Sequence, residues 1–250
     1  MDEDDGGFDG YRYEINRWNM RVLSVQFVRI ACRMYGTSGV ARRLKMSAGM
    51  VSRYKNGGSL PAYPQAVKII DTFSKEMDLQ SVVGGLVKVC NGGFLDDESA
   101  VSDPTVLELA VLDCLSKFAG RRVTKVMTMA VNGVPLATLI ASRIGKSLVI
   151  VKPYRGVSAD GFVEVSVQGE DGVARSYYMC RNAINRFDDV LIVDDIVRSG
   201  RSLSVMLEFV RMAHAGVAGI YVLIAVGDRW RSVVPSDVKF ECGLTCVGRR

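Results

Sequence analysis

The residues best suited to chemistry lie together in residues 190–202, VLIVDDIVRSGRS. An apolar run that predicts a buried strand leads directly to Asp194 and Asp195. A short polar loop follows, made of Arg198, Ser199, Gly200, Arg201 and Ser202. Its hydroxyls and the unpaired backbone N–H groups at the start of the next helix, expected near Ser202, suit a phosphate group. Because the carboxylates suit vicinal hydroxyls or Mg²⁺, the stretch predicts a site for a ribose 5-phosphate.

The flanking segments predict the scaffold that positions this stretch. Along residues 103–250, continuous apolar runs alternate with segments of helical periodicity, and this order predicts an α/β fold with a mostly parallel sheet. The expected strands are 123–131, 147–154, 189–196 and 219–228, and the expected helices are 104–120, 134–145 and 202–216. Ligands bind beyond the carboxyl ends of the strands in such sheets, and we expect Asp194 and Asp195 at such an end. Residues 162–179 alternate around GEDG, which predicts a projecting hairpin.

The first 75 residues predict a small all-α domain. Helical stripes cover residues 19–36 and 39–45, and Gly36 separates them. Ser47 is placed to cap a third helix that ends near Gly57, and Pro64 suits the first turn of a fourth helix. Residues 76–102 contain two Gly-Gly pairs and an acidic run, which indicate a linker between this domain and residues 103–250.

The positive charge of the chain is concentrated in this front domain. The chain has 32 basic and 27 acidic side chains, a net charge of +5. Residues 21–60 contain eight basic side chains and no acidic one. A block of this kind suits a polyanionic partner, and we expect double-stranded DNA. The alternatives are a solvated basic face or a helical interaction domain that contacts no nucleic acid.

Residues 40–54, VARRLKMSAGMVSRY, resemble the helix-turn-helix of repressor-type regulators. The resemblance implies that the second helix, capped by Ser47, enters the major groove with Ala48, Gly49, Ser52 and Arg53 near bases or phosphates. It also implies phosphate contacts from Arg42, Arg43 and Lys55. Lys45 stands at the turn position where this family usually has glycine, so a left-handed backbone there would cost about 1 kcal/mol.

The stretch VLIVDDIVRSGRS resembles the phosphoribosyl pyrophosphate motif of type I phosphoribosyltransferases. Residues 130–154, AVNGVPLATLIASRIGKSLVIVKPY, resemble the orotate-type members, which implies ligand contacts from Asn132, Gly133 and Lys152. The hairpin at 160–180 takes the place of the flexible hood loop of that family, and residues 226–230, VGDRW, fall where the loop near the base begins. The resemblance also implies Mg²⁺ held through the bound ligand beside Asp194 and Asp195.

A helix-turn-helix joined to this domain resembles the orotate phosphoribosyltransferase-like regulators of archaea. A related arrangement occurs in bacterial purine repressors, which have a winged-helix front. The resemblance implies a homodimeric, DNA-binding regulator that senses phosphoribosyl pyrophosphate or a nucleotide. The loop is unusual in containing Arg198 and Arg201, and residues 157–174 contain no Lys, Arg or His to neutralise departing pyrophosphate. These departures favour a non-catalytic sensor; the alternatives are an active phosphoribosyltransferase for orotate or a purine base and a scaffold without either role.

Targeting and cysteine patterns point to the cytoplasm. No apolar run reaches the roughly 18 residues that a membrane span needs, and the acidic N-terminus lacks the features of a signal peptide. The six cysteines are scattered, and we expect free thiols. The spacing of Cys242 and Cys246 leaves a bridge between them open.

Overall fold

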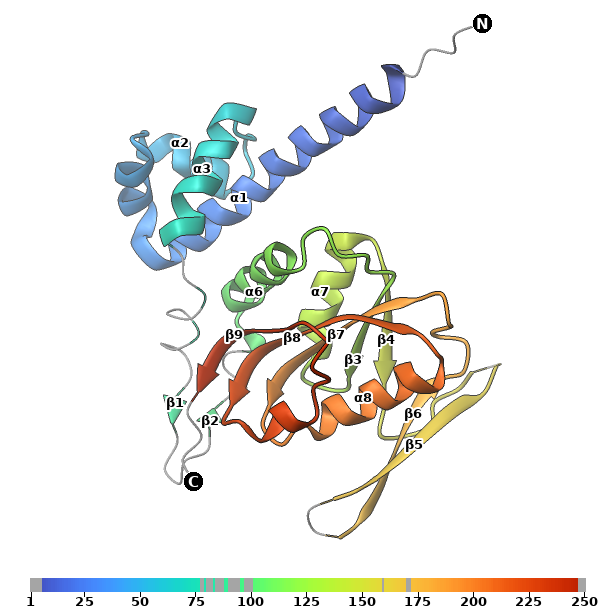
Figure 1. Ribbon diagram of the computed structural model, residues 1–250. Coiled ribbons are helices and arrows are strands. Elements are labelled where there is room, and N and C mark those ends of the chain that lie inside the picture. Colours follow the sequence, from blue (N-terminus) through green and yellow to red (C-terminus); the bar gives the residue numbers. More distant parts are fainter. Residues whose placement is uncertain are drawn as a thin grey trace, which may run out of the picture. The chain divides into compact units, whose positions relative to one another are not determined.

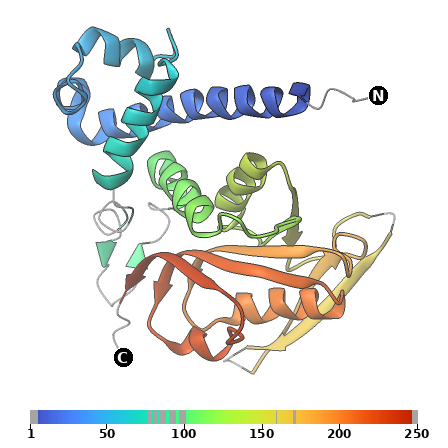
Figure 2. The same ribbon diagram turned by 45° about the horizontal axis from the view of Figure 1, so that its top comes forward.

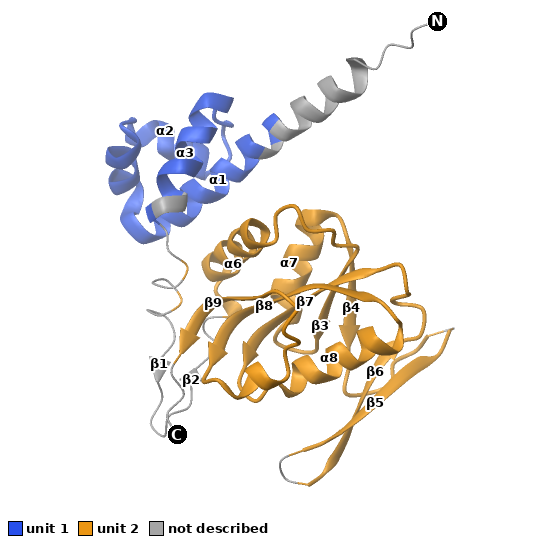
Figure 3. Cartoon of the chain, viewed as in Figure 1, with its two compact units in different colours: residues 1–78 blue, residues 79–250 orange. Residues whose placement is uncertain are grey.

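The computed structural model describes residues 6–76, 79, 83, 88–89, 95–96, 101–158, 160–169 and 172–246. The chain forms two compact units, Met1–Asp78 and Leu79–Arg250, which Figure 3 colours separately. Most of the expected linker at 76–102 lies outside the described residues. Within it, β1 (Lys88–Val89) and β2 (Leu95–Asp96) form a short antiparallel pair.

In its described residues, 6–76, the first unit contains helices and no strand. Helix α1 (Gly6–Leu44) is broken at Gly36, which has φ 70° and ψ 162°, so the expected break between two helical segments is confirmed. After Leu44 the chain turns through Lys45, whose φ of 54° lies in the left-handed region. Helices α2 (Ala48–Lys55) and α3 (Tyr63–Glu76) complete the unit, as the sequence predicted.

The helices of the first unit pack around one apolar core. Fully buried apolar side chains come from all three helices: Val28, Ala31, Val40, Leu44, Val51, Ala66, Ile69 and Phe73. Ala41 and Tyr54 are also buried, at 7% exposure each. Two side-chain to backbone hydrogen bonds fasten α1 to the following segments: Arg21 Nε donates to Pro61 O at 2.7 Å, and Lys68 Nζ donates to Leu44 O at 3.3 Å.

The second unit is built on a five-stranded parallel sheet in the order β4-β3-β7-β8-β9. Its strands are β3 (Lys125–Met129), β4 (Ser147–Val151), β7 (Asp189–Val197), β8 (Gly216–Val226) and β9 (Phe240–Cys246). The expected mostly parallel α/β sheet is confirmed. Strand β9 was not predicted, because its sequence FECGLTC lacks a long apolar run. Cys242 and Cys246 both lie in β9 as free thiols, so the bridge left open by their spacing does not form.

Helices cover both faces of this sheet (Figures 1 and 2). Helices α6 (Pro104–Lys117) and α7 (Val134–Ile144) lie on one face, and α8 (Arg201–Met212) lies on the other. Asp103 caps α6, because its Oδ1 accepts hydrogen bonds from Thr105 N at 2.6 Å and Val106 N at 3.2 Å. Among the described residues, no helix is long and apolar enough to cross a membrane.

The predicted hairpin forms a separate two-stranded sheet from β5 (Phe162–Gln168) and β6 (Ala174–Cys180). Figure 1 shows it extending away from the main sheet. Its root is joined to the end of β4 by two backbone hydrogen bonds between Lys152 and Tyr178, at 2.9 and 2.8 Å. Val165 and Met179 belong to the apolar core of the second unit, and Val163, Val167 and Tyr177 pack against it.

Candidate functional site

The residues predicted to bind ligand meet at the carboxyl edge of the parallel sheet. Asn132 and Gly133 follow β3, Lys152 follows β4, and the loop 198–200 follows β7 and leads into α8. The chain segment after β8 also reaches this edge, as the 3-10 helix η1 (Arg229–Ser232). Because the strands run parallel, loops that are far apart in sequence are brought to one edge.

The two aspartates lie near the carboxyl end of β7, within the expected strand 189–196. Strand β7 pairs with β3 only through residues 190–192 but stays paired with β8 as far as Val197. Asp194 and Asp195 therefore stand where β7 is no longer paired with β3 but is still paired with β8. The pattern of a single strand does not show where its pairing with each neighbour stops.

Asp194 is a buried carboxyl group, only 4% exposed. Burial raises the pKa of Asp194 well above its ordinary value, and the charge of neighbouring Asp195 raises it further. Its Oδ1 accepts a hydrogen bond from Asp195 N at 3.1 Å. Asp195 is half-buried. The pair therefore presents one carboxyl that favours its protonated form beside one that is more accessible.

Gly133 packs directly against this pair from the loop after β3. A Cβ on Gly133 would overlap Thr128 Oγ1 and would lie 2.9 Å from Asp194 Oδ1. Thr128 is fully buried, and its hydroxyl has no hydrogen-bond partner within the described structure. Gly133 thus lets the loop cover Thr128 and Asp194 closely, while Val131 and Asn132 remain exposed at its tip.

The loop after β7 is equally tight. Gly200 has φ 85°, and a Cβ there would lie 2.9 Å from Val233 Cγ2 and 3.1 Å from Trp230 Cα. Helix α8 begins at Arg201, one residue earlier than predicted, and Ser199 Oγ accepts a hydrogen bond from Arg201 N at 3.5 Å. The first-turn N–H groups of a helix have no partner within that helix, so the start of α8 can receive an anion. We call Asp194, Asp195, the loop 130–133 and residues 198–202 the acid-pair cradle.

The residues after β8 support the cradle from outside. Trp230 is only 3% exposed, stacks on Phe240 at 4.1 Å between ring centroids, and donates its Nε1 hydrogen to Gly227 O at 2.9 Å. Its backbone packs against Gly200. Residues 226–230, VGDRW, are expected where the loop near the base begins, and within them the Trp230 ring is buried in the core.

Two arginines stand at the edges of the β5–β6 hairpin: Arg155 precedes β5, and Arg175 lies in β6. Arg155 follows β4, forms an ion pair with Glu164 of β5 at 2.9 Å, and lies 5.1 Å from the centre of the Tyr178 ring. Lys152 is half-buried and held through its backbone by Tyr178. The described part of the hairpin between 160 and 174 contains no basic side chain.

A metal ion in the cradle would depend on a bound ligand. In the described residues, no group of three or more His, Cys, Asp or Glu side chains could hold a metal. Asp194 and Asp195 offer at most two carboxylates, and the raised pKa of Asp194 disfavours its ionised form. Mg²⁺ takes about six oxygen ligands, so the residues fit this ion only together with phosphate oxygens and water.

The predicted DNA-contacting residues lie on and around α2 in the first unit. Ser47 Oγ accepts a hydrogen bond from Met50 N at 3.2 Å, which confirms the predicted cap. Ala48, Gly49, Arg53 and Lys55 are exposed, Ser52 is half-buried, and Arg42 is exposed at the end of α1. Arg43 is held within the unit, because it pairs with Glu76 at 2.8 Å and lies 3.8 Å from the centre of the Tyr35 ring.

Sequence comparison identifies the family of the second unit. The sequence model of the phosphoribosyl transferase domain family matches residues 110–242, so the chain belongs to this family. The purine biosynthesis transcriptional repressor PurR of Bacillus subtilis is 29% identical over 138 residues, which are 55% of this chain and 48% of PurR. The xanthine phosphoribosyltransferase of Agathobacter rectalis is 30% identical over 124 residues, 49% of this chain and 65% of that enzyme. The chain thus aligns with about half to two thirds of these relatives.

Solved structures show the same fold. The adenine phosphoribosyltransferase from Rhodothermus marinus superposes with a TM-score of 0.59 at 23% identity, over 67% of this chain and 98% of that enzyme. The enzyme from Thermoanaerobacter pseudethanolicus has the same TM-score at 16% identity, over 66% of this chain and 99% of that enzyme. The mostly parallel sheet is therefore that of a type I phosphoribosyltransferase. At these identities the likeness concerns the fold.

The structure adds two residues that the sequence did not indicate as part of the site. Thr128 lies beneath Gly133, and Val233 lies against Gly200. The sequence offered one indication that Thr128 belongs to the site, since it is the only hydroxyl residue in the strand KVMTM. The sequence offered no such indication for Val233, because its contact with Gly200 depends on the path of the chain after β8.

Proposed function

We propose that this protein is a DNA-binding transcriptional regulator whose phosphoribosyltransferase-like domain senses phosphoribosyl pyrophosphate or a nucleotide. One observation carries the proposal: a helical unit whose residues 21–60 are basic and contain no acidic side chain, and which has a capped, exposed helix, is joined to a phosphoribosyl transferase domain. That two relatives are named as a purine repressor and a purine phosphoribosyltransferase supports a purine-related ligand over orotate.

The cradle accounts for the ligand half of the proposal. The first-turn N–H groups of α8 and the hydroxyls of Ser199 and Ser202 receive the 5-phosphate. Asp194 and Asp195 accept hydrogen bonds from the ribose hydroxyls, and the loop with Asn132 and Gly133 faces the pyrophosphate. Lys152 and Arg198 supply positive charge at the rim. When Mg²⁺ accompanies the ligand it neutralises pyrophosphate charge, and Asp195 is the accessible carboxylate beside it.

The helical unit accounts for the DNA half. Helix α2 enters the major groove as the second helix of a helix-turn-helix, with Ala48, Gly49, Ser52 and Arg53 toward the bases. Arg42 and Lys55 contact phosphates, and Arg43 does so only if it leaves Glu76. Proteins with this motif read paired half-sites as dimers, so the regulator acts as a homodimer.

A second candidate function is an active phosphoribosyltransferase for a purine base. The xanthine phosphoribosyltransferase of Agathobacter rectalis, at 30% identity, favours it. The lack of a basic side chain in the described hairpin residues 160–174 disfavours it, because departing pyrophosphate then meets no mobile cation. Arg155 is tied to Glu164 and would have to release that pair to help.

DNA binding tests the proposal most directly. Fluorescence anisotropy with the DNA upstream of the protein's own gene, at 50 and 200 mM salt, is expected to show binding that weakens steeply with salt. Phosphoribosyl pyrophosphate with Mg²⁺, or a purine nucleotide, is expected to change that affinity. The double variant Asp194→Asn, Asp195→Asn should keep DNA binding and lose the ligand effect.

The outcomes separate the two functions. Absence of DNA binding at 50 mM salt would reject the regulator. Pyrophosphate release with adenine, hypoxanthine, guanine, xanthine or orotate would establish the enzyme. If the ligand still changes the DNA affinity of the double variant, the ligand does not bind in the cradle.

A further inference from the structure

The second unit contains a cavity at the end of the sheet opposite the cradle. It has a volume of about 260 Å³ and is lined by Cys114, Leu115, Phe118, Ala119, Arg121, Val123, Ile144, Lys146 and Leu191. These residues come from the C-terminal ends of α6 and α7 and from the amino ends of β3, β4 and β7. The cavity is therefore separate from the acid-pair cradle, which lies at the carboxyl edge.

The inside of the cavity is apolar. Cys114, Phe118 and Leu191 form its buried part, at 0%, 6% and 2% exposure, and Leu115, Val123 and Ile144 are half-buried. Burial raises the pKa of the Cys114 thiol to about 12, so this group stays neutral at physiological pH and acts as an apolar surface. The lining favours hydrocarbon or an aromatic ring over a sugar.

The rim of the cavity carries two cations without a carboxylate partner. Arg121 and Lys146 are both exposed, and in the described part of the chain neither forms an ion pair. Arg121 is held by a hydrogen bond from its Nη1 to Ala218 O at 3.3 Å. Cations are common after helix C-termini, so their location alone is no evidence of a ligand.

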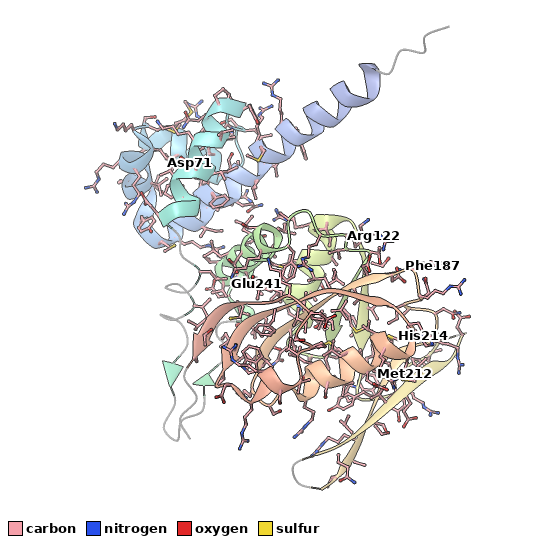
Figure 4. The ribbon with its side chains drawn as sticks, viewed as in Figure 1. Asp71, Arg122, Phe187, Met212, His214 and Glu241 are labelled. Carbon is pink, nitrogen blue, oxygen red and sulfur yellow. The ribbon has the colours of Figure 1, made fainter. Side chains whose placement is uncertain are left out.

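Three neighbouring basic residues differ from Arg121 and Lys146, because each of them forms an ion pair with a carboxylate. Arg122 pairs with Asp189, Lys117 pairs with Asp113 at 2.9 Å, and Arg143 pairs with Glu108 at 2.7 Å. Arg122 also donates to Phe187 O at 3.1 Å, and Figure 4 labels both residues at this edge. Arg121 and Lys146, which line the cavity, thus lack the ion pair that each of these three neighbours forms within the described part of the chain.

We propose that this cavity binds a small carboxylate with an apolar body, such as an aromatic or medium-chain acid. The body fills the space between α6 and α7, and the carboxylate accepts hydrogen bonds from Arg121 and Lys146. The volume, slightly below the range of about 300–1,000 Å³ typical of drug-sized ligands, limits the ligand to one or two rings or a short chain. The proposal is independent of what occupies the cradle.

Calorimetric titration of the full chain with 1-naphthoate and with octanoate tests the proposal. We expect binding at one site per chain, at least about tenfold tighter for 1-naphthoate than for its neutral counterpart 1-naphthalenemethanol. Arg121→Gln and Lys146→Gln should each weaken 1-naphthoate by a similar factor. Ala119→Leu, at an exposed position on the cavity wall, should abolish binding by filling the space.

Arg122→Gln is the matched control, because it removes a neighbouring cation that is paired and does not line the cavity. It should leave the affinity for 1-naphthoate unchanged. Emission of the buried Trp230 verifies that each variant is folded. No binding of either acid at millimolar concentration, or binding that Ala119→Leu leaves intact, would overturn the proposal. A change in the sedimentation coefficient of Ala119→Leu would instead assign the cavity to a contact between copies.

Discussion

The two proposed binding surfaces differ in how closely their residues are packed: those proposed to face DNA are mostly exposed, and those of the acid-pair cradle are in close contact with the rest of the fold. Ala48, Gly49 and Arg53 are exposed on α2, and a Cβ added to Gly49 would meet nothing within 4 Å. In the cradle, Asp194 is buried, and a Cβ on Gly133 or Gly200 would meet neighbouring atoms at 2.9 Å or less. Substitutions at the exposed positions of α2 should therefore change DNA binding without loss of stability, whereas substitutions in the cradle should change ligand binding and stability together.

The largest effect is expected from Gly133→Ala. The added methyl group must displace Thr128 Oγ1 and Asp194 Oδ1, and overpacking of this kind costs about 1–3 kcal/mol. Urea unfolding followed by Trp230 emission measures the cost, because Trp230 is buried in the second unit and the other tryptophan, Trp18, is already 56% exposed. Unchanged stability would show that the loop covers Asp194 less tightly than described.

Asp194→Asn should instead stabilise the second unit. The pKa of Asp194 is raised in the folded protein, whereas a free carboxyl in the unfolded chain ionises near pH 4. Above about pH 4 the folded protein therefore binds more protons at this residue than the unfolded chain does. Folding stability from this group is thus present at low pH and is lost as pH rises. Asparagine cannot ionise, so the free energy of unfolding of the variant should exceed that of the unchanged protein by an amount that grows from pH 5 to pH 8. Each unit by which folding raises the pKa of Asp194 corresponds to about 1.4 kcal/mol of this difference. A constant difference across this range would contradict the raised pKa.

Ser47→Ala tests the scaffold of the first unit. The substitution removes the hydrogen bond that Met50 N donates to Ser47 Oγ, and loss of such a cap costs about 1 kcal/mol. Helical circular dichroism during thermal unfolding should show the loss in the first unit, with the Trp230 transition unchanged. Movement of both transitions together would mean that the two units unfold as one.

Gly49→Ala is the counterpart of Gly133→Ala in the first unit, and we expect the opposite sign. Gly49 lies within α2 with open space around it, and replacing a helical glycine with alanine gains roughly 0.5–1 kcal/mol. The methyl group would also enter the proposed DNA interface. Thermal unfolding and anisotropy on the same sample would reveal a more stable protein with altered DNA affinity.

Arg53→Ala should have the smallest effect on folding and a clear effect on DNA. Arg53 is exposed and, within the described structure, forms no ion pair, so its removal should change stability by less than about 0.5 kcal/mol. If it neutralises one phosphate, the slope of log affinity against log salt should fall by about 0.9. Anisotropy over a salt series measures the slope, and an unchanged slope would remove Arg53 from the interface.

Patterns that depend on local chemistry were readable from the sequence. The break at Gly36, the cap at Ser47 and the start of α6 after Asp103 all follow from short-range backbone preferences. The apolar runs predicted four of the five strands of the main sheet, because a parallel strand buried on both faces needs no alternation. The stretch around Asp194 and Asp195 resembles the motif of type I phosphoribosyltransferases, and the family match over residues 110–242 agrees with that resemblance.

Other features depended on the path of the chain in space. Strand β7 stops pairing with β3 before Asp194 but stays paired with β8, and the loop at Gly133 packs against Asp194, whose burial raises its pKa. The burial of Trp230, the unpaired hydroxyl of Thr128 and the cavity between α6 and α7 likewise arise from contacts between segments distant in sequence. Sequence spacing specifies which groups are present and how the local backbone turns. Desolvation and close packing are set by neighbours that only the folded sheet brings together.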